Sequence, residues 1–211
     1  MQQISDKKPT HRKKPLQSRS RDRVDLIICC TQRILCRAEL TKITTSKIAK
    51  EAGIPVGSVY QYFKDCDAIL LALGNQIISA ENLKLEKLFE EVSVRAHWRH
   101  VVRTVITAFA KIVFEGDVRH RLDRVLSNNI EWQVLNRSSE KRMVQFFSEY
   151  QLFSERGLSP EDARTISRMI VASATATVMR ARSLSSSTEA NRLVEEMIKM
   201  VTAYFSSIFG D

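Results

Sequence analysis

Apolar residues recur along this chain every three or four positions, which is the spacing of an amphipathic helix. The first such face covers residues 21–38, and a long helix is predicted over 66–92. Further helices are predicted over 97–115, 117–135, 138–156, 160–184 and 187–209, with breaks at Gly116, Asn136, Gly157 and 183–187. No stretch alternates apolar and polar residues as a strand does, and no internal repeat occurs. The pattern therefore predicts an all-α protein of about nine helices.

The stretch between residues 44 and 66 has the signals of two short helices joined by a tight turn. A side-chain oxygen of Thr44 or Thr45 can cap the first helix. Gly53 tolerates the left-handed conformation that ends helices. Pro55 disfavours helical angles in the residue before it and fits the first turn of a second helix over 56–63. Two helices that meet at a sharp angle predict a helix-turn-helix, although ordinary helical hairpins share this spacing.

The second of these helices is rich in side chains that suit a DNA groove. Small residues at its start allow close backbone approach, hydroxyl and amide groups can bond base edges, and tyrosine hydroxyls can reach phosphates. The residues concerned are Gly57, Ser58, Tyr60, Gln61 and Tyr62. We therefore interpret residues 44–66 as the centre of a DNA-binding head.

The apolar, small and aromatic residues of this head also occur at the spacing of a known family. They are Ile48, Ala49, Ala52, Gly53, Ile54, Gly57, Val59, Tyr60, Tyr62, Phe63, Lys64, Ile69 and Leu70. With them, residues 20–75 resemble the N-terminal domain of the TetR/AcrR family of bacterial transcription regulators. The family usually has a phosphate-binding lysine at the position of Cys66, so the chain departs from the family there.

The resemblance implies which residues of the head touch double-stranded operator DNA. The residues expected on phosphates are Thr45, Tyr60, Tyr62 and Lys64. Those expected near base edges are Ser46, Val56, Gly57 and Ser58. Gln61 is added on chemical grounds, because its amide can bond a base edge.

The pattern and the resemblance together predict three parts, namely a basic flexible arm over 1–20, a helix-turn-helix domain over 21–65, and a ligand-binding and dimerisation domain over 66–211. The formal net charge is +9, of which residues 1–23 hold +6. Such a basic segment attracts a polyanion, although it can also be a solvated solubility tail. The chain shows no secretory signal and no apolar stretch long enough to span a bilayer. We therefore expect a cytoplasmic bacterial protein that joins the nucleoid when bound.

The helices after residue 66 present apolar and aromatic faces. Such faces are most often plain core, but the resemblance implies that they enclose a cavity for a small apolar or amphipathic inducer. Asn129 and Gln133 lie on or beside the apolar stripe of Trp132, and a buried amide is satisfied either by the protein or by a ligand. The residues expected at the ligand site are Phe109, Asn129, Trp132, Gln133, Phe147, Tyr150 and Thr177.

The last two predicted helices are interpreted as a homodimer interface. Residues 172–177 are small and permit close helix approach. Val194 and Ile198 widen the apolar stripe of 187–209 beyond what one core needs. In the TetR-like family two subunits pair such helices into a four-helix bundle, and their heads meet a pseudo-palindromic operator. We therefore expect a dimeric repressor that its inducer releases from DNA.

Three other functions are weighed against this one. All four cysteines, Cys29, Cys30, Cys36 and Cys66, lie in or beside the head, which leaves a thiol-sensing regulator as an alternative. A DNA-binding regulator without a small-molecule ligand is a second alternative. An enzyme is not expected, because the chain has no nucleophile elbow, phosphate loop or zinc-binding HExxH motif. We also expect no cofactor and no metal.

Overall fold

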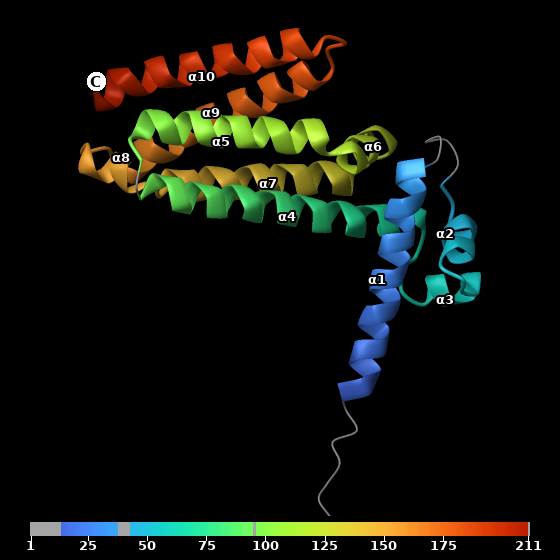
Figure 1. Cartoon of the computed structure of the whole chain (residues 1–211). Coiled ribbons are helices and arrows are strands. Elements are labelled where there is room, and N and C mark those ends of the chain that lie inside the picture. Colours follow the sequence, from blue (N-terminus) through green and yellow to red (C-terminus); the bar gives the residue numbers. More distant parts are fainter. Residues whose placement is uncertain (1–13, 38–42, 95, 211) are drawn as a thin grey trace, which may run out of the picture. The chain divides into compact units, whose positions relative to one another are not determined.

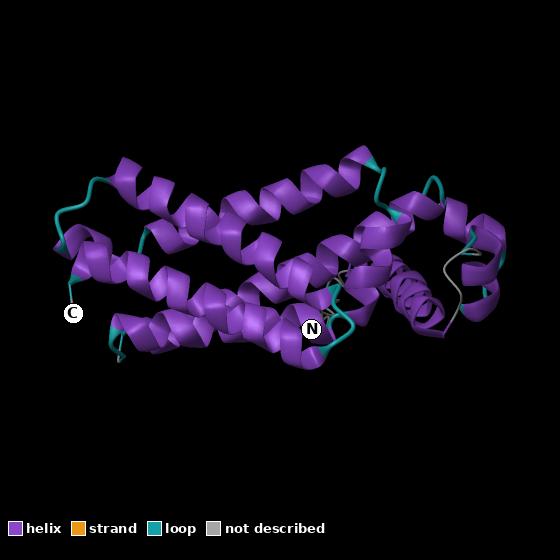
Figure 2. Ribbon diagram, turned by 90° about the horizontal axis from the view of Figure 1, so that it is seen from above, coloured by secondary structure: helices purple, strands orange, loops and turns teal. Residues whose placement is uncertain are grey.

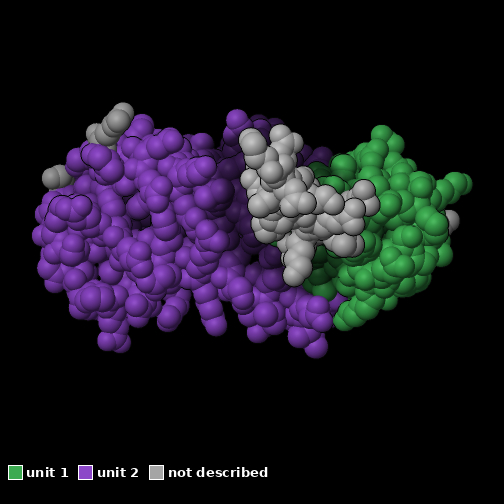
Figure 3. All heavy atoms as spheres, turned by 90° about the horizontal axis from the view of Figure 1, so that it is seen from below, with its two compact units in different colours: residues 1–73 green, residues 74–211 purple. Residues whose placement is uncertain are grey.

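The computed structural model describes residues 14–37, 43–94 and 96–210. These residues form ten α-helices and no strand, which confirms the predicted all-α class (Figures 1 and 2). Residues 1–13, the first part of the predicted basic arm, lie outside the described residues. The chain divides into two compact units, residues 1–73 and 74–211 (Figure 3). The division falls within one helix, α4 (Cys66–Ser93), rather than at its start.

The first unit is a small head built from α1 (Lys14–Arg37), α2 (Thr45–Glu51), α3 (Val56–Tyr60) and the beginning of α4. Helix α2 packs against both α1 and α3. Helix α3 is shorter than the predicted 56–63, because the amides of Tyr62 and Phe63 both donate to the Val59 carbonyl at 3.0 Å. The core of the head consists of the buried residues Ile27, Ile48, Ala49, Val59 and Ile69.

Local signals set the helix ends of the head. Thr44 is the residue that caps α2, since its Oγ1 accepts a hydrogen bond from the Lys47 amide at 3.3 Å. Gly53 has a φ of 65°, which is the left-handed conformation that stops α2. Asp65 caps α4, because its Oδ1 accepts from the Ala68 amide at 2.8 Å.

The second unit is a helical bundle. It contains the rest of α4, then α5 (Trp98–Glu115), α6 (Asp117–Val125), α7 (Ile130–Ser148), α8 (Gln151–Glu155), α9 (Pro160–Arg182) and α10 (Ser187–Phe209). Helix α9 packs against α5, α7 and α10, and α10 also packs against α5. At one end of the core, the rings of Trp98, Phe153, Phe205 and Phe209 meet with centroids 4.9 to 6.1 Å apart.

The predicted break at Asn136 is wrong. Asn136 lies inside α7, where its Nδ2 donates to the Trp132 carbonyl at 3.0 Å. The chain breaks earlier, between Val125 and Ile130, so that the predicted helix 117–135 becomes α6 and the start of α7. A second break divides the predicted helix 138–156 into the end of α7 and the short α8. An asparagine can end a helix or bond within one, and only tertiary contacts decide between the two.

Candidate nucleic-acid interface and ligand cavity

Helix α3 and the turn after it form an exposed face on the head. Val56 is 41% exposed, Tyr60 53% and Tyr62 38%, although large apolar and aromatic side chains are usually buried. A Cβ atom built on Gly57 meets no other atom within 4 Å, so the backbone there is open to a close partner. Other exposed predicted contact residues are Ser46, Gln61 and Lys64, and Ser58 is half-buried. The nine predicted DNA-contact residues therefore lie on α2, α3 and the turn that follows, with only Thr45 buried.

Thr45 makes a contact that the sequence does not reveal. The Thr45 and Tyr60 hydroxyl oxygens are 2.9 Å apart and share a hydrogen bond, and Thr45 is only 9% exposed. This bond ties the start of α2 to the end of α3 and fixes the direction of the Tyr60 ring. In this arrangement the Thr45 hydroxyl supports Tyr60, whereas the resemblance implies that it meets a phosphate itself.

Cys66 stands at the start of α4, at the position where a phosphate-binding lysine is usual. Its thiol donates to the Ile43 carbonyl at 3.6 Å. Burial raises its pKa to about 11, and the negative charges of Asp67 and Asp65 add to the rise. A thiol with so high a pKa is almost entirely protonated at neutral pH, and the protonated form is the unreactive one. The structure thus argues against Cys66 as a redox sensor.

The other three cysteines lie on α1 and are also free thiols. Cys29 and Cys36 are exposed, whereas Cys30 is buried and its sulfur accepts a hydrogen bond from Arg33 Nη2 at 3.0 Å. No disulfide forms among the four.

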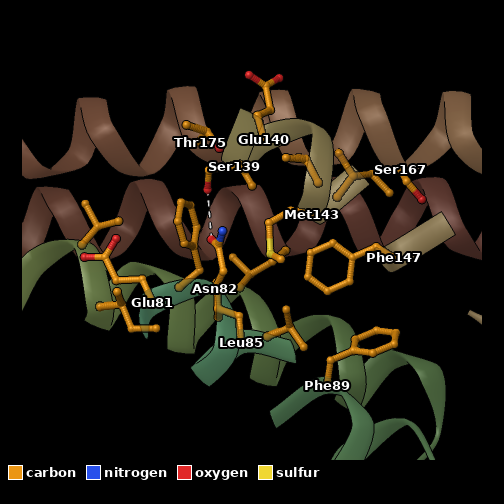
Figure 4. A pocket seen from close by; sticks show the side chains of 18 of the residues that line it. Glu81, Asn82, Leu85, Phe89, Ser139, Glu140, Met143, Phe147, Ser167 and Thr175 are labelled. Atoms are coloured by element: carbon orange, nitrogen blue, oxygen red, sulfur yellow. Dashed lines mark hydrogen bonds between the residues drawn. The ribbon is translucent and has the colours of Figure 1, made fainter. Parts of the chain in front are cut away.

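The second unit encloses a cavity of about 310 Å³ (Figure 4). Side chains from α4, α5, α7 and α9 make up most of its lining. Three of the seven predicted ligand residues, Phe109, Phe147 and Tyr150, line it. Burial raises the pKa of the Tyr150 hydroxyl, and Glu155 adds to this. A volume of this size accommodates a small organic molecule.

The other predicted ligand residues do not line this cavity. Asn129 caps α7, because its Oδ1 accepts from the Trp132 amide at 3.1 Å. Gln133 is exposed, and its Nε2 lies 3.5 Å from the Ser127 carbonyl. These amides are therefore satisfied by the protein and do not wait for a ligand.

Trp132 and Thr177 contact other side chains inside the bundle. Trp132 is 3% exposed, and its indole N–H donates to Asp123 Oδ1 at 3.2 Å. The Thr177 hydroxyl faces the Met197 sulfur at 3.8 Å, on the side of α9 that packs against α10. Both were placed on the correct apolar faces of their helices, but those faces meet other helices rather than the cavity.

The polar part of the cavity lining includes residues outside the predicted ligand site. Glu81, Asn82, Arg119 and Asp123 all line it, on α4 and α6. Arg119 Nη1 lies 3.0 Å from Glu81 Oε2, and Arg119 Nε lies 3.4 Å from Asp123 Oδ1. The spacing of Glu81, Leu85 and Phe89 on one face of α4 was the available signal, because residues four apart share a helix face.

The last two helices bury more of their apolar residues within the single chain than expected. Val194 is 6% exposed and Ile198 2%, so neither contributes to a surplus apolar surface. This corrects the prediction, which overlooked how much of α10 packs against both α5 and α9. Apolar side chains that do remain exposed on these helices are Met169 (46%), Met179 (40%), Met200 (53%) and Tyr204 (36%).

Comparison with known proteins places the head in a family. Residues 40–73 match the family of bacterial regulatory proteins named after tetR. This match supports the resemblance of the head to the TetR family. An uncharacterized HTH-type transcriptional regulator of Haemophilus influenzae is 31% identical to the chain over 85 residues, which are 38% of this chain and 46% of that protein. The match thus spans less than half of that relative.

Solved structures of TetR-type proteins share the fold of most of the chain. A putative TetR-family transcriptional regulator from Mesorhizobium loti superposes with a TM-score of 0.69 at 16% identity, covering 88% of this chain and 98% of that one. A TetR-family transcriptional regulator from Streptomyces coelicolor gives 0.61 at 18% identity, covering 88% and 99%. At such identities the likeness concerns the fold.

No helix among the described residues combines the length and the apolar character that a membrane span requires. Within the same residues, no group of three or more His, Cys, Asp or Glu side chains is arranged to hold a metal ion.

Proposed function

We propose that this protein is a homodimeric transcriptional repressor that binds a pseudo-palindromic operator and is released by a small molecule, and that it has no enzymatic role. The observation that carries the proposal is the exposed face of α3, where an open glycine backbone lies beside exposed tyrosine, glutamine and lysine side chains. The chemistry of this face fits a phosphate backbone and base edges.

The roles of individual residues other than Gln61 and Thr45 are those that the resemblance implies, and they are supported by the fact that Thr45 alone among the nine is buried. Gly57 and Ser58 approach the base edges together with Val56, Ser46 and Gln61. Tyr60, Tyr62 and Lys64 bind phosphates. Thr45 acts mainly by orienting Tyr60, through the hydrogen bond of 2.9 Å between their hydroxyl groups.

Dimerisation uses the outer faces of α9 and α10. The exposed side chains of Met169, Met200 and Tyr204 supply apolar surface there, and the small residues of 172–177 allow close approach. A symmetric pair of such helices would form a four-helix bundle and present two heads to DNA.

The small molecule binds in the cavity of the second unit and acts through α4. This single helix begins in the head at Cys66 and contributes Glu81, Asn82 and Phe89 to the cavity lining. The ligand releases DNA only if it binds the released state more tightly than the DNA-bound state. The change it imposes on α4 would supply that difference.

A gel-shift assay with DNA fragments selected from a random pool by the wild-type protein tests the DNA-binding role. Tyr60→Ala and Lys64→Ala should abolish or strongly reduce retention, while gel filtration shows an unchanged oligomeric state. Lys87→Ala, which removes an exposed lysine from the second unit, is the matched control and should bind normally. Full retention by both head variants would reject the assignment.

A further inference from the structure

The cavity of the second unit changes its chemical character along its length (Figure 4). Helix α9 lines it from Ser167 to Arg182, and a rise of about 1.5 Å per residue places these two residues about 22 Å apart. On the Ser167 side, the rings of Phe89 and Phe147 meet with centroids 5.1 Å apart. Glu81 lies on the opposite side of the view from these rings. The cavity thus has an aromatic end and a polar end.

At the polar end, two carboxylates share one guanidinium. Arg119 lies 3.0 Å from Glu81 and 3.4 Å from Asp123, donates to Asn136 Oδ1, and stacks 5.0 Å from the centroid of the Trp132 ring. Burial raises the pKa of Glu81, Arg119 counteracts the rise, and Asp123 adds to it. The second oxygen of each carboxylate has no hydrogen-bond partner among the described residues. Around Arg119 the two carboxylates therefore outnumber the guanidinium, and each keeps unused acceptor capacity.

Arg182, a second half-buried cation of the lining, also bonds to the protein. It donates to the carbonyl of Val113 and to that of Gly116, the latter at 3.3 Å, and its Nη2 lies 3.7 Å from Asp117. An anionic ligand at Arg182 would compete with these protein acceptors. A ligand that donates hydrogen bonds would meet free carboxylate oxygens instead.

Asn82 gives independent evidence that a polar group of a ligand belongs at this end. It is only 8% exposed and lines the cavity beside Glu81. Its Oδ1 accepts from the Ser139 hydroxyl at 3.0 Å, the bond drawn in Figure 4. No described residue accepts a hydrogen bond from its Nδ2. Nδ2 is not completely enclosed, because Ser167 Oγ is the one fully buried polar atom without a partner among the described residues. Since Asn82 lines the cavity, its Nδ2 can donate to a ligand there.

We propose that the ligand of this cavity is an amphipathic organic amine. Its ammonium group lies against the carboxylates of Glu81 and Asp123, an adjacent hydroxyl or carbonyl oxygen accepts from Asn82, and its apolar body extends to Phe89 and Phe147. The inference rests on the proposed function, because it assumes that the cavity is the ligand site, and it adds the charge that the ligand must carry.

Titration calorimetry with three probes that share an apolar chain and differ in their polar group tests the charge of the ligand. The probes are decylamine, 1-decanol and decanoate, each below the concentration at which it forms micelles. We expect the full-length protein to bind decylamine at least about tenfold more tightly than decanoate, as a half-buried charge interaction allows, with decanol between them. Glu81→Gln should reduce this ratio to within about threefold, because the remaining carboxylate and Arg119 then cancel.

Glu140→Gln is the matched control. Glu140 also lines the cavity, but it is exposed, and Figure 4 shows its carboxylate directed away from the other lining residues. The preference for the amine should survive in this variant. Asp123→Asn is the second test variant and should act like Glu81→Gln, so the inference stays testable if one of the two fails to fold. Circular dichroism checks the folding of both.

A fourth probe, N-(2-hydroxyethyl)decylamine, tests the role of Asn82. Its hydroxyl oxygen should improve binding about threefold over decylamine, and Asn82→Leu should remove that gain while the preference for the amine remains.

The outcomes separate this inference from the function on which it rests. Equal or tighter binding of decanoate, or an unchanged ratio in Glu81→Gln and Asp123→Asn, overturns the proposed ligand charge while the cavity remains a ligand site. If none of the probes binds, both the amine and the ligand part of the proposed function fall. Operator binding by the head is measured separately and depends on neither result.

Discussion

Gly74, on the part of α4 that belongs to the second unit, faces the ring of Trp132 so closely that no side chain fits between them. A Cβ atom at Gly74 would lie 2.2 Å from Trp132 Cζ3 and 2.8 Å from Cη2, whereas carbon atoms normally keep about 3.5–4.0 Å apart. The ring would have to retreat by about 1.5 Å to restore that separation. Its hydrogen bond to Asp123 and its stacking with Arg119 oppose such a movement.

We therefore predict that Gly74→Ala destabilises the protein. Overpacking a core of this kind costs about 1–3 kcal/mol, and the better helix propensity of alanine returns at most about 1 kcal/mol. A net loss of about 1–2 kcal/mol should lower the melting temperature by about 3–6 °C in a chain of this size. Thermal unfolding followed by circular dichroism measures the change.

A double-mutant cycle makes the prediction sharper. In the Trp132→Leu background the clash is absent, so Gly74→Ala should become neutral or stabilising by up to about 1 kcal/mol. A reversal of sign between the two backgrounds would establish that the ring is the cause. If Gly74→Ala is as destabilising with leucine at position 132 as with tryptophan, or stabilises the wild type, the account of this contact is wrong.

Three further predictions concern the head. Gly57→Ala should leave thermal stability within about 1 kcal/mol of wild type, since the added Cβ meets no atom within 4 Å. It should weaken operator binding about tenfold in an anisotropy titration, because the added methyl group would stand between the helix and the DNA groove. Unchanged affinity would contradict the close approach of Gly57 to DNA. Thr45→Val and Tyr60→Phe should each reduce operator affinity about threefold to tenfold, and the double variant should lose little more than either one, because both remove the same hydrogen bond; fully additive losses would show that the two hydroxyls act independently. Cys66 keeps its proton up to a pKa of about 11, whereas an unfolded thiol releases it near 9.0. The stability that the protonated thiol contributes is therefore fully present below pH 9 and is lost as the pH rises towards 11. Urea unfolding should show that the free energy of unfolding falls more between pH 8 and pH 10 for wild type than for Cys66→Ser. Equal falls would mean that Cys66 is not the group responsible.

The head and the helix ends were predictable because they depend on neighbouring residues. Thr44, Asp65 and Ser159 each cap a helix through the amide three residues later, and α10 covers the predicted range 187–209. Gly53 adopts the left-handed turn that its position indicated. Caps and turns of this kind need no knowledge of the rest of the fold.

The ion pairs at the polar end of the cavity were not predictable, because they join residues far apart in the chain. Arg119 meets Glu81 on another helix, and nothing near either residue in the sequence indicates the pairing. For Asn129 the helical spacing suggested a ligand contact, whereas in the structure its side chain caps α7. Helical periodicity identifies which face of a helix is apolar, but it does not distinguish a face that lines a cavity from one that packs against a neighbour.

Selective binding of operator DNA and its loss on ligand binding test the central claim most directly. Fragments enriched by the wild-type protein from a random pool should share a pseudo-palindromic sequence with half-sites about one helical turn, or a multiple of one, apart. Anisotropy should show one dimer per site, with an affinity that falls as salt rises and falls again when a ligand fills the cavity. If no fragment is enriched over unselected DNA, or if Tyr60→Ala binds the enriched fragments as tightly as wild type does, the protein does not act through the exposed face of α3.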